Sequence, residues 1–227
     1  MKPQSFGPFE RTILTKDILS KLRLDVILGN LKPGVRVVET QLSSEYGVSR
    51  GPIRTALQML EQEGLVKTLP NGGTVIVGFS NKDAEDMFDF RLMMEYKALE
   101  LILQNPMVSY APILEITEMI RDIHNKGEEI SAQQITALDI QFHRSLMIMA
   151  ENQQMQRAWD TMSNLLYTIL NIANTTYDSF FDFYKKHKEL ADAIIQKNQD
   201  CYKILDNHIL GAKVELAQRL SKQLKGK

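Results

Sequence analysis

An aspartate and a histidine lie four positions apart in the segment LDIQFHRSL, residues 138–146, whose apolar spacing otherwise predicts a buried helix. Residues four apart project from one helix face, so Asp139 and His143 could bind a single metal ion together. A hydrogen bond between the two side chains is the alternative, and for this pair taken alone we favour it. A metal site would need further ligands from elsewhere in the chain.

Two other histidines, His187 and His208, are candidates for these ligands. They are 21 residues apart, which on one continuous helix is about 31 Å, too far to share an ion. The polar segment QKNQD, residues 196–200, interrupts the apolar pattern at their midpoint, and an antiparallel helical hairpin there would bring both rings level. Three histidines and an aspartate could then converge in a helical bundle, a nitrogen and oxygen ligand set that suits a borderline divalent ion.

The remaining unusual side chains favour structural roles. His124 lies near a predicted helix end beside Asn125 and Gly127, and we interpret it as solvated. The methionine-rich stretch SLMIMAENQQM, the aromatic run YDSFFDFY and Trp159 are interpreted as core and helix-packing surface rather than a cofactor site.

The composition is that of a soluble globular protein, with 227 residues, 44% of them hydrophobic and 24% charged. The first ten residues lack the apolar core of a signal peptide, and no later run approaches the roughly 18 apolar residues of a membrane helix. The only cysteine, Cys201, excludes an intrachain disulfide and a cysteine-rich zinc site. We therefore expect a cytoplasmic protein with no membrane partner.

The pattern along the chain predicts two domains, residues 1–79 and 80–227. Residues 1–80 carry a net charge of +3 and the rest a net charge of −4, which weakly favours an anionic partner for the first domain. The apolar periodicity of the second domain predicts a purely helical bundle without repeats. Its helices are expected at 82–104, 111–125, 131–150, 153–174, 179–197 and 200–224.

The pattern of the first domain predicts a winged helix-turn-helix. The fold class expected for the whole chain is therefore mainly α, with one small β-hairpin. Helices are expected at 11–29, 39–46 and 49–63, with Gly47 in the tight turn before the third. Two β-prone runs, LVKTL and TVIVG, flank the turn PNGG at 70–73 and predict the hairpin.

The third helix, in GVSRGPIRTALQML, carries hydrogen-bond donors in its first two turns, where a recognition helix meets base edges. Ser49 can cap the helix and donate to a phosphate. Arg50 and Arg54 share the exposed face, and arginine's planar fork matches guanine O6 and N7. Two packed helices without a DNA partner are the alternative, but the hairpin, the arginines and the sign of the charge all favour DNA.

The segment LKPGVRVVETQLSSEYGVSRGPIRTALQMLEQEGLV resembles the DNA-binding domain of the GntR family of bacterial transcription regulators. The resemblance implies contacts with double-stranded operator DNA, with the wing in the minor groove, from Arg36, Arg50, Arg54 and Gly73. Thr40 and Gly72 stand where the family often has a basic residue and an arginine, so the resemblance does not imply the operator sequence or the affinity for it.

The segments DIQFH, KKHKELADAI and DNHI resemble the helical effector-binding domain called FCD, over roughly residues 82–222. This resemblance implies a divalent metal in a cavity where a small carboxylate completes the coordination; zinc is the first expectation, and nickel, manganese and iron are alternatives. The ligands it implies are Asp139, His143, His187 and His208. Arg91, four before Glu95, matches a family arginine that either faces the effector's carboxylate or pairs with Glu95.

Together these patterns predict a ligand-responsive bacterial transcription regulator and not an enzyme. We expect a homodimer on a palindromic operator, because paired recognition helices meet half-sites about 34 Å apart, with an organic acid as effector. The alternative from another class is a metal-dependent hydrolase-like enzyme, since three histidines and an aspartate could also activate water. Against it, the sequence presents no separate general base, nucleophile or oxyanion donor.

Overall fold

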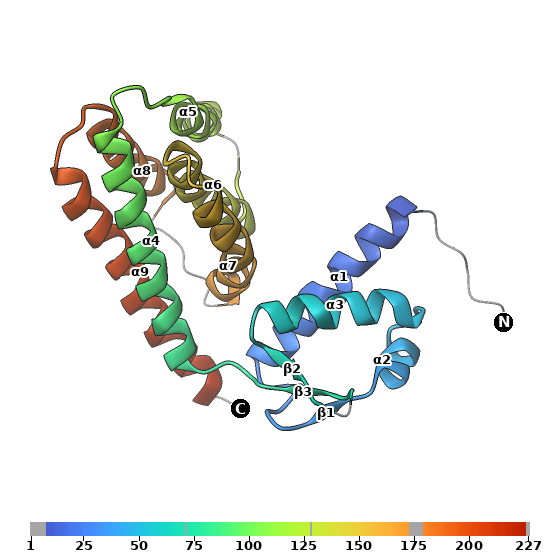
Figure 1. The fold of residues 1–227 in the computed structure, drawn as a ribbon. Coiled ribbons are helices and arrows are strands. Elements are labelled where there is room, and N and C mark those ends of the chain that lie inside the picture. Colours follow the sequence, from blue (N-terminus) through green and yellow to red (C-terminus); the bar gives the residue numbers. More distant parts are fainter. Residues whose placement is uncertain (1–7, 71, 128, 173–178, 226–227) are drawn as a thin grey trace. The chain divides into compact units, whose positions relative to one another are not determined.

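The computed structural model of the chain describes residues 8–70, 72–127, 129–172 and 179–225 (Figure 1). The chain divides into two compact units, Met1–Ser80 and Asn81–Lys227. Within the described ranges, no helix is both long and apolar enough to cross a membrane.

The first unit combines three helices with a small antiparallel sheet. Its elements are α1 (Pro8–Ile27), β1 (Arg36–Val37), α2 (Glu39–Glu45), α3 (Arg50–Gln62), β2 (Val66–Thr68) and β3 (Thr74–Ile76). The predicted hairpin is confirmed as β2 and β3, although Asn71 of its turn lies outside the described residues. The sheet order is β1-β3-β2, and the pairing of Arg36 opposite Val75 adds a third strand that the sequence analysis did not anticipate.

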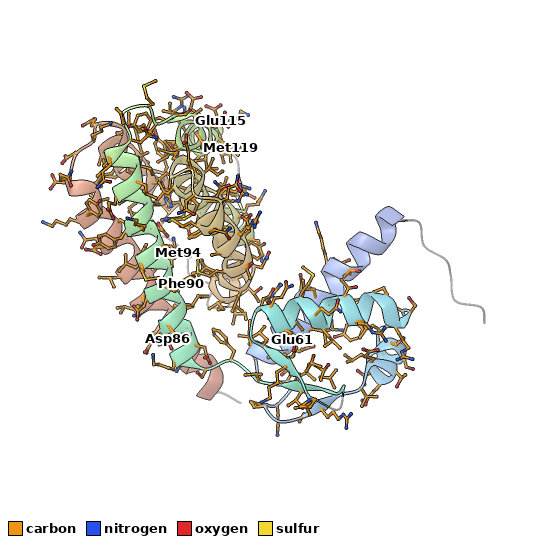
Figure 2. The ribbon with its side chains drawn as sticks, in the orientation of Figure 1. Glu61, Asp86, Phe90, Met94, Glu115 and Met119 are labelled. Atoms are coloured by element: carbon orange, nitrogen blue, oxygen red, sulfur yellow. The ribbon has the colours of Figure 1, made fainter. Side chains whose placement is uncertain are left out.

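The core of this unit lies between α1 and α3, which bury apolar faces against each other. The α1 helix contributes Ile18, Leu22 and Val26, and α3 contributes Ile53, Leu57 and Leu60. A buried ion pair joins the two helices at one end, where Arg23 donates twice to Glu63, at 2.7 and 2.6 Å. Glu61, labelled in Figure 2, accepts hydrogen bonds from the backbone and hydroxyl of Thr68 and so fixes α3 against β2. These contacts hold the exposed face of α3 in a set orientation.

The described part of the second unit is entirely helical between its turns. Its helices are α4 (Asn81–Gln104), α5 (Ala111–Lys126), α6 (Ala132–Met149), α7 (Gln153–Ile172), α8 (Phe180–Ile195) and α9 (Asp200–Lys225). Helix α6 packs against α4, α5 and α7, while α9 packs along both α4 and α8 (Figure 1). The expected helices are confirmed within one to two residues at their ends, and positions 173–174 of the expected fourth one lie outside the described residues.

Local signals explain where α6, α8 and α9 begin and end. Ser131 and Gln134 form a reciprocal capping box at the start of α6, and Ser179 accepts from the backbone N–H of Asp182 at the start of α8. Between α8 and α9, Lys197 adopts a left-handed φ of 53°, and the N–H of Asn198 donates to the carbonyl of Ala193. The helical hairpin predicted at 196–200 is thereby confirmed.

Helix α6 carries polar side chains into an otherwise apolar core. Phe142, Leu146 and Met147 are fully buried, yet Asp139 and His143 on the same helix are 6% and 0% exposed. Buried polar groups cost free energy unless they are paired, so these two side chains require partners from neighbouring helices.

Candidate metal centre and nucleic-acid interface

Four side chains from three helices converge inside the second unit. Asp139 and His143 come from α6, His187 from α8 and His208 from α9, and one ligand atom of each lies within 4.8 Å of all the others. The first three are buried, and the side chain of His208 is 7% exposed. The hairpin between α8 and α9 therefore does bring its two histidines level with the pair on α6.

The distances between the ligand atoms fit one shared cation. His143 Nε2 and His208 Nε2 are 3.0 Å apart, and Asp139 Oδ1 lies 3.1, 3.6 and 3.8 Å from the Nε2 atoms of His187, His208 and His143. With metal–ligand bonds of about 2.1 Å, neighbouring ligand atoms are about 3.0 Å apart in an octahedron and about 3.4 Å apart in a tetrahedron. These four separations, from 3.0 to 3.8 Å, lie close to both values, so the donor types and the spacing of the cluster suit a small divalent ion.

The hydrogen bonds on the far side of the rings favour the same interpretation. His143 Nδ1 lies 2.5 Å from Glu95 Oε2, and His187 Nδ1 lies 2.8 Å from the carbonyl oxygen of Phe183. Both oxygens only accept, so both Nδ1 atoms donate and leave the Nε2 lone pairs facing the cluster. A second hydrogen bond of this kind is what fixes the tautomer of metal-binding histidines in known sites.

A hydrogen bond between Asp139 and His143, the alternative weighed for this pair, is not formed. Their closest atoms, Asp139 Oδ1 and His143 Nε2, are 3.8 Å apart, beyond hydrogen-bond distance. His143 bonds instead to Glu95, 48 residues away in sequence. The pair on α6 is therefore part of a larger arrangement.

Arg91 and Glu95 form a buried charged layer beside the cluster. Arg91 Nε donates to Glu95 Oε1 at 2.7 Å, and the Arg91 guanidinium Nη2 lies 3.6 Å from Asp139 Oδ2. The pairing with Glu95 that the sequence analysis weighed for Arg91 is therefore present. Glu95 stands between Arg91 and His143 and binds both, so this carboxylate is already engaged rather than poised as a general base.

Burial and charge set the protonation of the cluster. Burial lowers the pKa of His208 to about 3 and is also the main cause of the lowered pKa of His143. The pKa of Asp139 lies well below its usual range because its interactions with His143, with the other two histidines and with Arg91 outweigh the opposing effect of burial. Neutral imidazoles beside an ionised carboxylate are the forms that bind metal ions.

In the first unit, the start of α3 presents its two arginines to solvent. The side chains of Arg50 and Arg54 are both 58% exposed, and each donates to the carboxylate of Glu39 at the start of α2. The distances are 3.2 Å from Arg50 Nη2, and 3.0 and 3.2 Å from Arg54 Nη2 and Nε. Ser49 occupies the N-cap position, but its side chain makes no capping hydrogen bond, so the expectation that it caps the helix through its side chain is wrong.

The wing places Arg36 and Gly73 in direct contact. A Cβ atom added at Gly73 would lie 2.6 Å from the Arg36 guanidinium, so any side chain at position 73 would displace that group. Strand β1 causes this proximity by pairing alongside β3. The two residues that the sequence analysis assigned to DNA through family resemblance thus share one surface at the wing.

Sequence reasoning missed three features of these sites. Glu39 accepts hydrogen bonds from both arginines of α3. Glu95 is bonded to His143, and the only sequence signal for this role was a second charge on the buried face of a helix, four residues after Arg91. His124 is not simply solvated: it is half-buried, with its ring 5.2 Å from that of Tyr184 and 5.3 Å from that of Phe181. These contacts join segments that are distant in sequence.

Comparison with known families identifies both units. Residues 14–76 match the family of bacterial regulatory proteins called gntR, and residues 86–210 match the FCD domain. The chain belongs to the GntR family of transcription regulators and carries the FCD type of effector domain.

Relatives and solved structures agree with this assignment. The chain is 29% identical over 194 residues to the uncharacterized HTH-type transcriptional regulator YdhC of Bacillus subtilis, covering 84% of each protein. It is 24% identical over 193 residues to the gluconate operon transcriptional repressor of the same organism, covering 84% of this chain and 70% of the repressor. The fold is similar to that of Lar, which controls expression of the Listeria monocytogenes agr system, with a TM-score of 0.69, 17% identity and coverage of 96% and 99%.

Proposed function

We propose that the protein is a ligand-responsive repressor or activator that binds a palindromic operator as a homodimer and senses a small organic acid at a metal centre. The observation that carries this proposal is the convergence of Asp139 with three histidines in the FCD domain of a chain whose other domain is a GntR DNA reader. DNA reading and metabolite sensing thus have separate sites in one chain.

For DNA recognition, Arg50 and Arg54 donate to guanine edges in the major groove, because they lie exposed in the first two turns of α3. Arg36 and Ser49 contact phosphates, and Gly73 lets the wing approach the minor groove closely. The open surface around Gly51, where an added Cβ would meet nothing within 4 Å, supports close approach of the duplex to the start of α3.

For sensing, Asp139, His143, His187 and His208 hold one divalent ion, with zinc as the first candidate because imidazole and carboxylate are among its usual ligands. When bound, the ion supplies a Lewis-acidic position for a carboxylate oxygen. Arg91 contributes positive charge on the Asp139 side of the cluster. The name of one relative, the gluconate operon transcriptional repressor of Bacillus subtilis, makes sugar acids the first compounds to test.

A homodimer follows from the two-fold symmetry of a palindromic operator. The packed helices α4 and α9 carry exposed apolar side chains that support an interface between copies: Phe90 (Figure 2), Met93, Leu210 and Val214. A monomer in light scattering that still bound a palindrome tightly would contradict this part of the proposal.

The decisive experiment selects DNA from a random pool with purified, zinc-loaded protein, in the presence and absence of gluconate, citrate or acetate. We expect an enriched palindrome whose retention changes with at least one of these acids. Protein stripped of metal should retain the same palindrome but lose the response, because the DNA-binding unit has its own core. Turnover of an ester panel at about 1 per second or faster would instead support an enzyme.

A further inference from the structure

Trp159 is the only tryptophan of the chain, and it lies beside the metal centre. Its side chain comes from α7, a helix that contributes no ligand to the cluster, and it is fully buried. The His143 ring stacks alongside the indole with centroids 6.3 Å apart, and the Arg91 guanidinium carbon lies 5.8 Å from the indole centroid. Trp159 therefore borders both the ligand cluster and the charged layer.

The indole nitrogen of Trp159 is a buried donor with no hydrogen-bond acceptor among the described residues. An indole N–H can only donate, and buried tryptophans usually find an acceptor, because an unsatisfied donor in an apolar interior costs free energy. Phenylalanine, although smaller, would place an aromatic ring in this core without an unsatisfied donor. The donor at this position is therefore open to an acceptor that the described residues do not supply.

The surroundings of the indole decide which kind of acceptor fits. Arg91 adds positive charge near the ring, and the Nε2 atoms of the neighbouring histidines are directed to the cluster. An acceptor that meets an indole N–H, a guanidinium and a cation-binding cluster together is a small anion with oxygen atoms.

We propose that the indole N–H of Trp159 donates a hydrogen bond to an oxygen of the bound carboxylate effector and so helps to select it. The inference rests on the proposed function, because it assumes that a small organic acid binds at the metal centre. Trp159 acts here as a ligand contact, and its N–H discriminates against compounds that present a methyl group or another donor at that position.

The test uses the full chain loaded with zinc and labelled with 15N at tryptophan, which yields a single indole N–H resonance because the chain has one tryptophan. Acetate and gluconate are the probes, titrated separately. We expect the indole proton resonance to move downfield on binding and its exchange with solvent to slow. An indole signal unchanged at saturating probe, with binding measured by calorimetry, would overturn the inference without any variant.

The matching variant is Trp159→Phe, which retains an aromatic ring and removes the N–H. It should keep its zinc and bind the probe roughly tenfold more weakly, the loss expected when a donor to a charged acceptor is deleted. Tyr110→Phe is the control: it removes another buried donor without an acceptor among the described residues, at the start of α5, which supplies no cluster ligand. The control should bind the probe as wild type does.

The outcomes separate this inference from the proposed function. If wild type binds neither acetate nor gluconate in its zinc form, the carboxylate effector class fails and Trp159's role fails with it. If wild type binds a probe and Trp159→Phe binds it equally well, the inference alone is overturned, and Trp159 is a core residue.

Discussion

The two candidate sites differ in how they handle charge. At the start of α3, the charged side chains are 58% exposed and share one partly exposed carboxylate, Glu39. In the second unit, Arg91, Glu95 and Asp139 have side chains no more than 8% exposed, and each is engaged by neighbouring groups. Exposed pairs contribute little to stability and can exchange partners, whereas a buried charge left without its partner is costly. The first arrangement can exchange its internal contacts for those of a partner, as the proposed DNA contact requires, whereas the second holds its groups in place, as the proposed ion site requires.

The largest expected effect is at the buried cluster. His143→Ala or His187→Ala should each lower metal affinity by more than roughly 100-fold, because loss of a direct ligand exceeds the effect of losing a supporting contact. The midpoint of thermal unfolding should fall with the metal content, since an ion that binds only the folded state stabilises it. Metal analysis after dialysis measures the metal content. Thermal unfolding with and without added zinc measures the shift of the midpoint.

His124→Ala is the matched control for these variants, because His124 lies on α5 and contacts aromatic rings rather than the cluster. It should retain about one ion per chain, as we expect for the wild type. A full metal complement in the His143 and His187 variants would show that the cluster is a structural network of buried hydrogen bonds.

The next largest effect is expected at Glu95, which is hydrogen-bonded to the His143 ring nitrogen that faces away from the cluster. Glu95→Gln removes the charge that orients His143 and should weaken metal binding about 10- to 100-fold, as for other supporting carboxylates. Competition with a chelator gives the affinity directly. The exposed acid Glu115, labelled in Figure 2 on α5, offers a control, and Glu115→Gln should not change the metal affinity. If the Glu95 variant bound the metal ion as tightly as wild type, Glu95 would serve only as the ion-pair partner of Arg91.

On the exposed side of the comparison, Arg50→Ala and Arg54→Ala should each weaken binding to the selected operator by about 1–3 kcal/mol and leave binding to random DNA nearly unchanged. Fluorescence anisotropy with both DNAs at one salt concentration separates the two effects.

Arg36→Ala should instead weaken binding to both DNAs and lower the salt slope by about one, as the loss of a phosphate contact does. Wild-type binding by all three variants would exclude α3 and the wing as the docking surface.

The smallest effect concerns the carboxylate between the arginines. Glu39→Gln should change the free energy of unfolding by less than about 1 kcal/mol, because the pairs are exposed. Hydrogen bonds from Arg54 and Arg50 outweigh partial burial and lower the pKa of Glu39. Its stabilising contribution is therefore complete above about pH 4.3, the ordinary glutamate value, and is lost as the pH falls through the lowered value. Urea unfolding of wild type and variant, at pH 7 and pH 3, measures the difference; a larger gap at pH 3 would contradict it.

Much of this protein is encoded locally and could be predicted from sequence. Apolar periodicity and turn residues located the helices, because these signals act within a few residues of one another. The polar segment at 196–200 predicted the turn that brings His187 and His208 level, and Lys197 and Asn198 form it. Arg50 and Arg54 were predictable as exposed for the same reason, since they lie opposite the apolar face of their own helix.

Only the tertiary structure decided which partners the charged and polar groups take. The pairing of His143 with Glu95 joins α6 to α4, and the position of Trp159 depends on how α7 packs against them both. Strand β1 brings Arg36 against Gly73 through pairing with β3, and Glu39 reaches α3 across a turn. Periodicity reports which face of a helix is buried, but the group that it meets there depends on packing between segments tens of residues apart, which no local pattern contains.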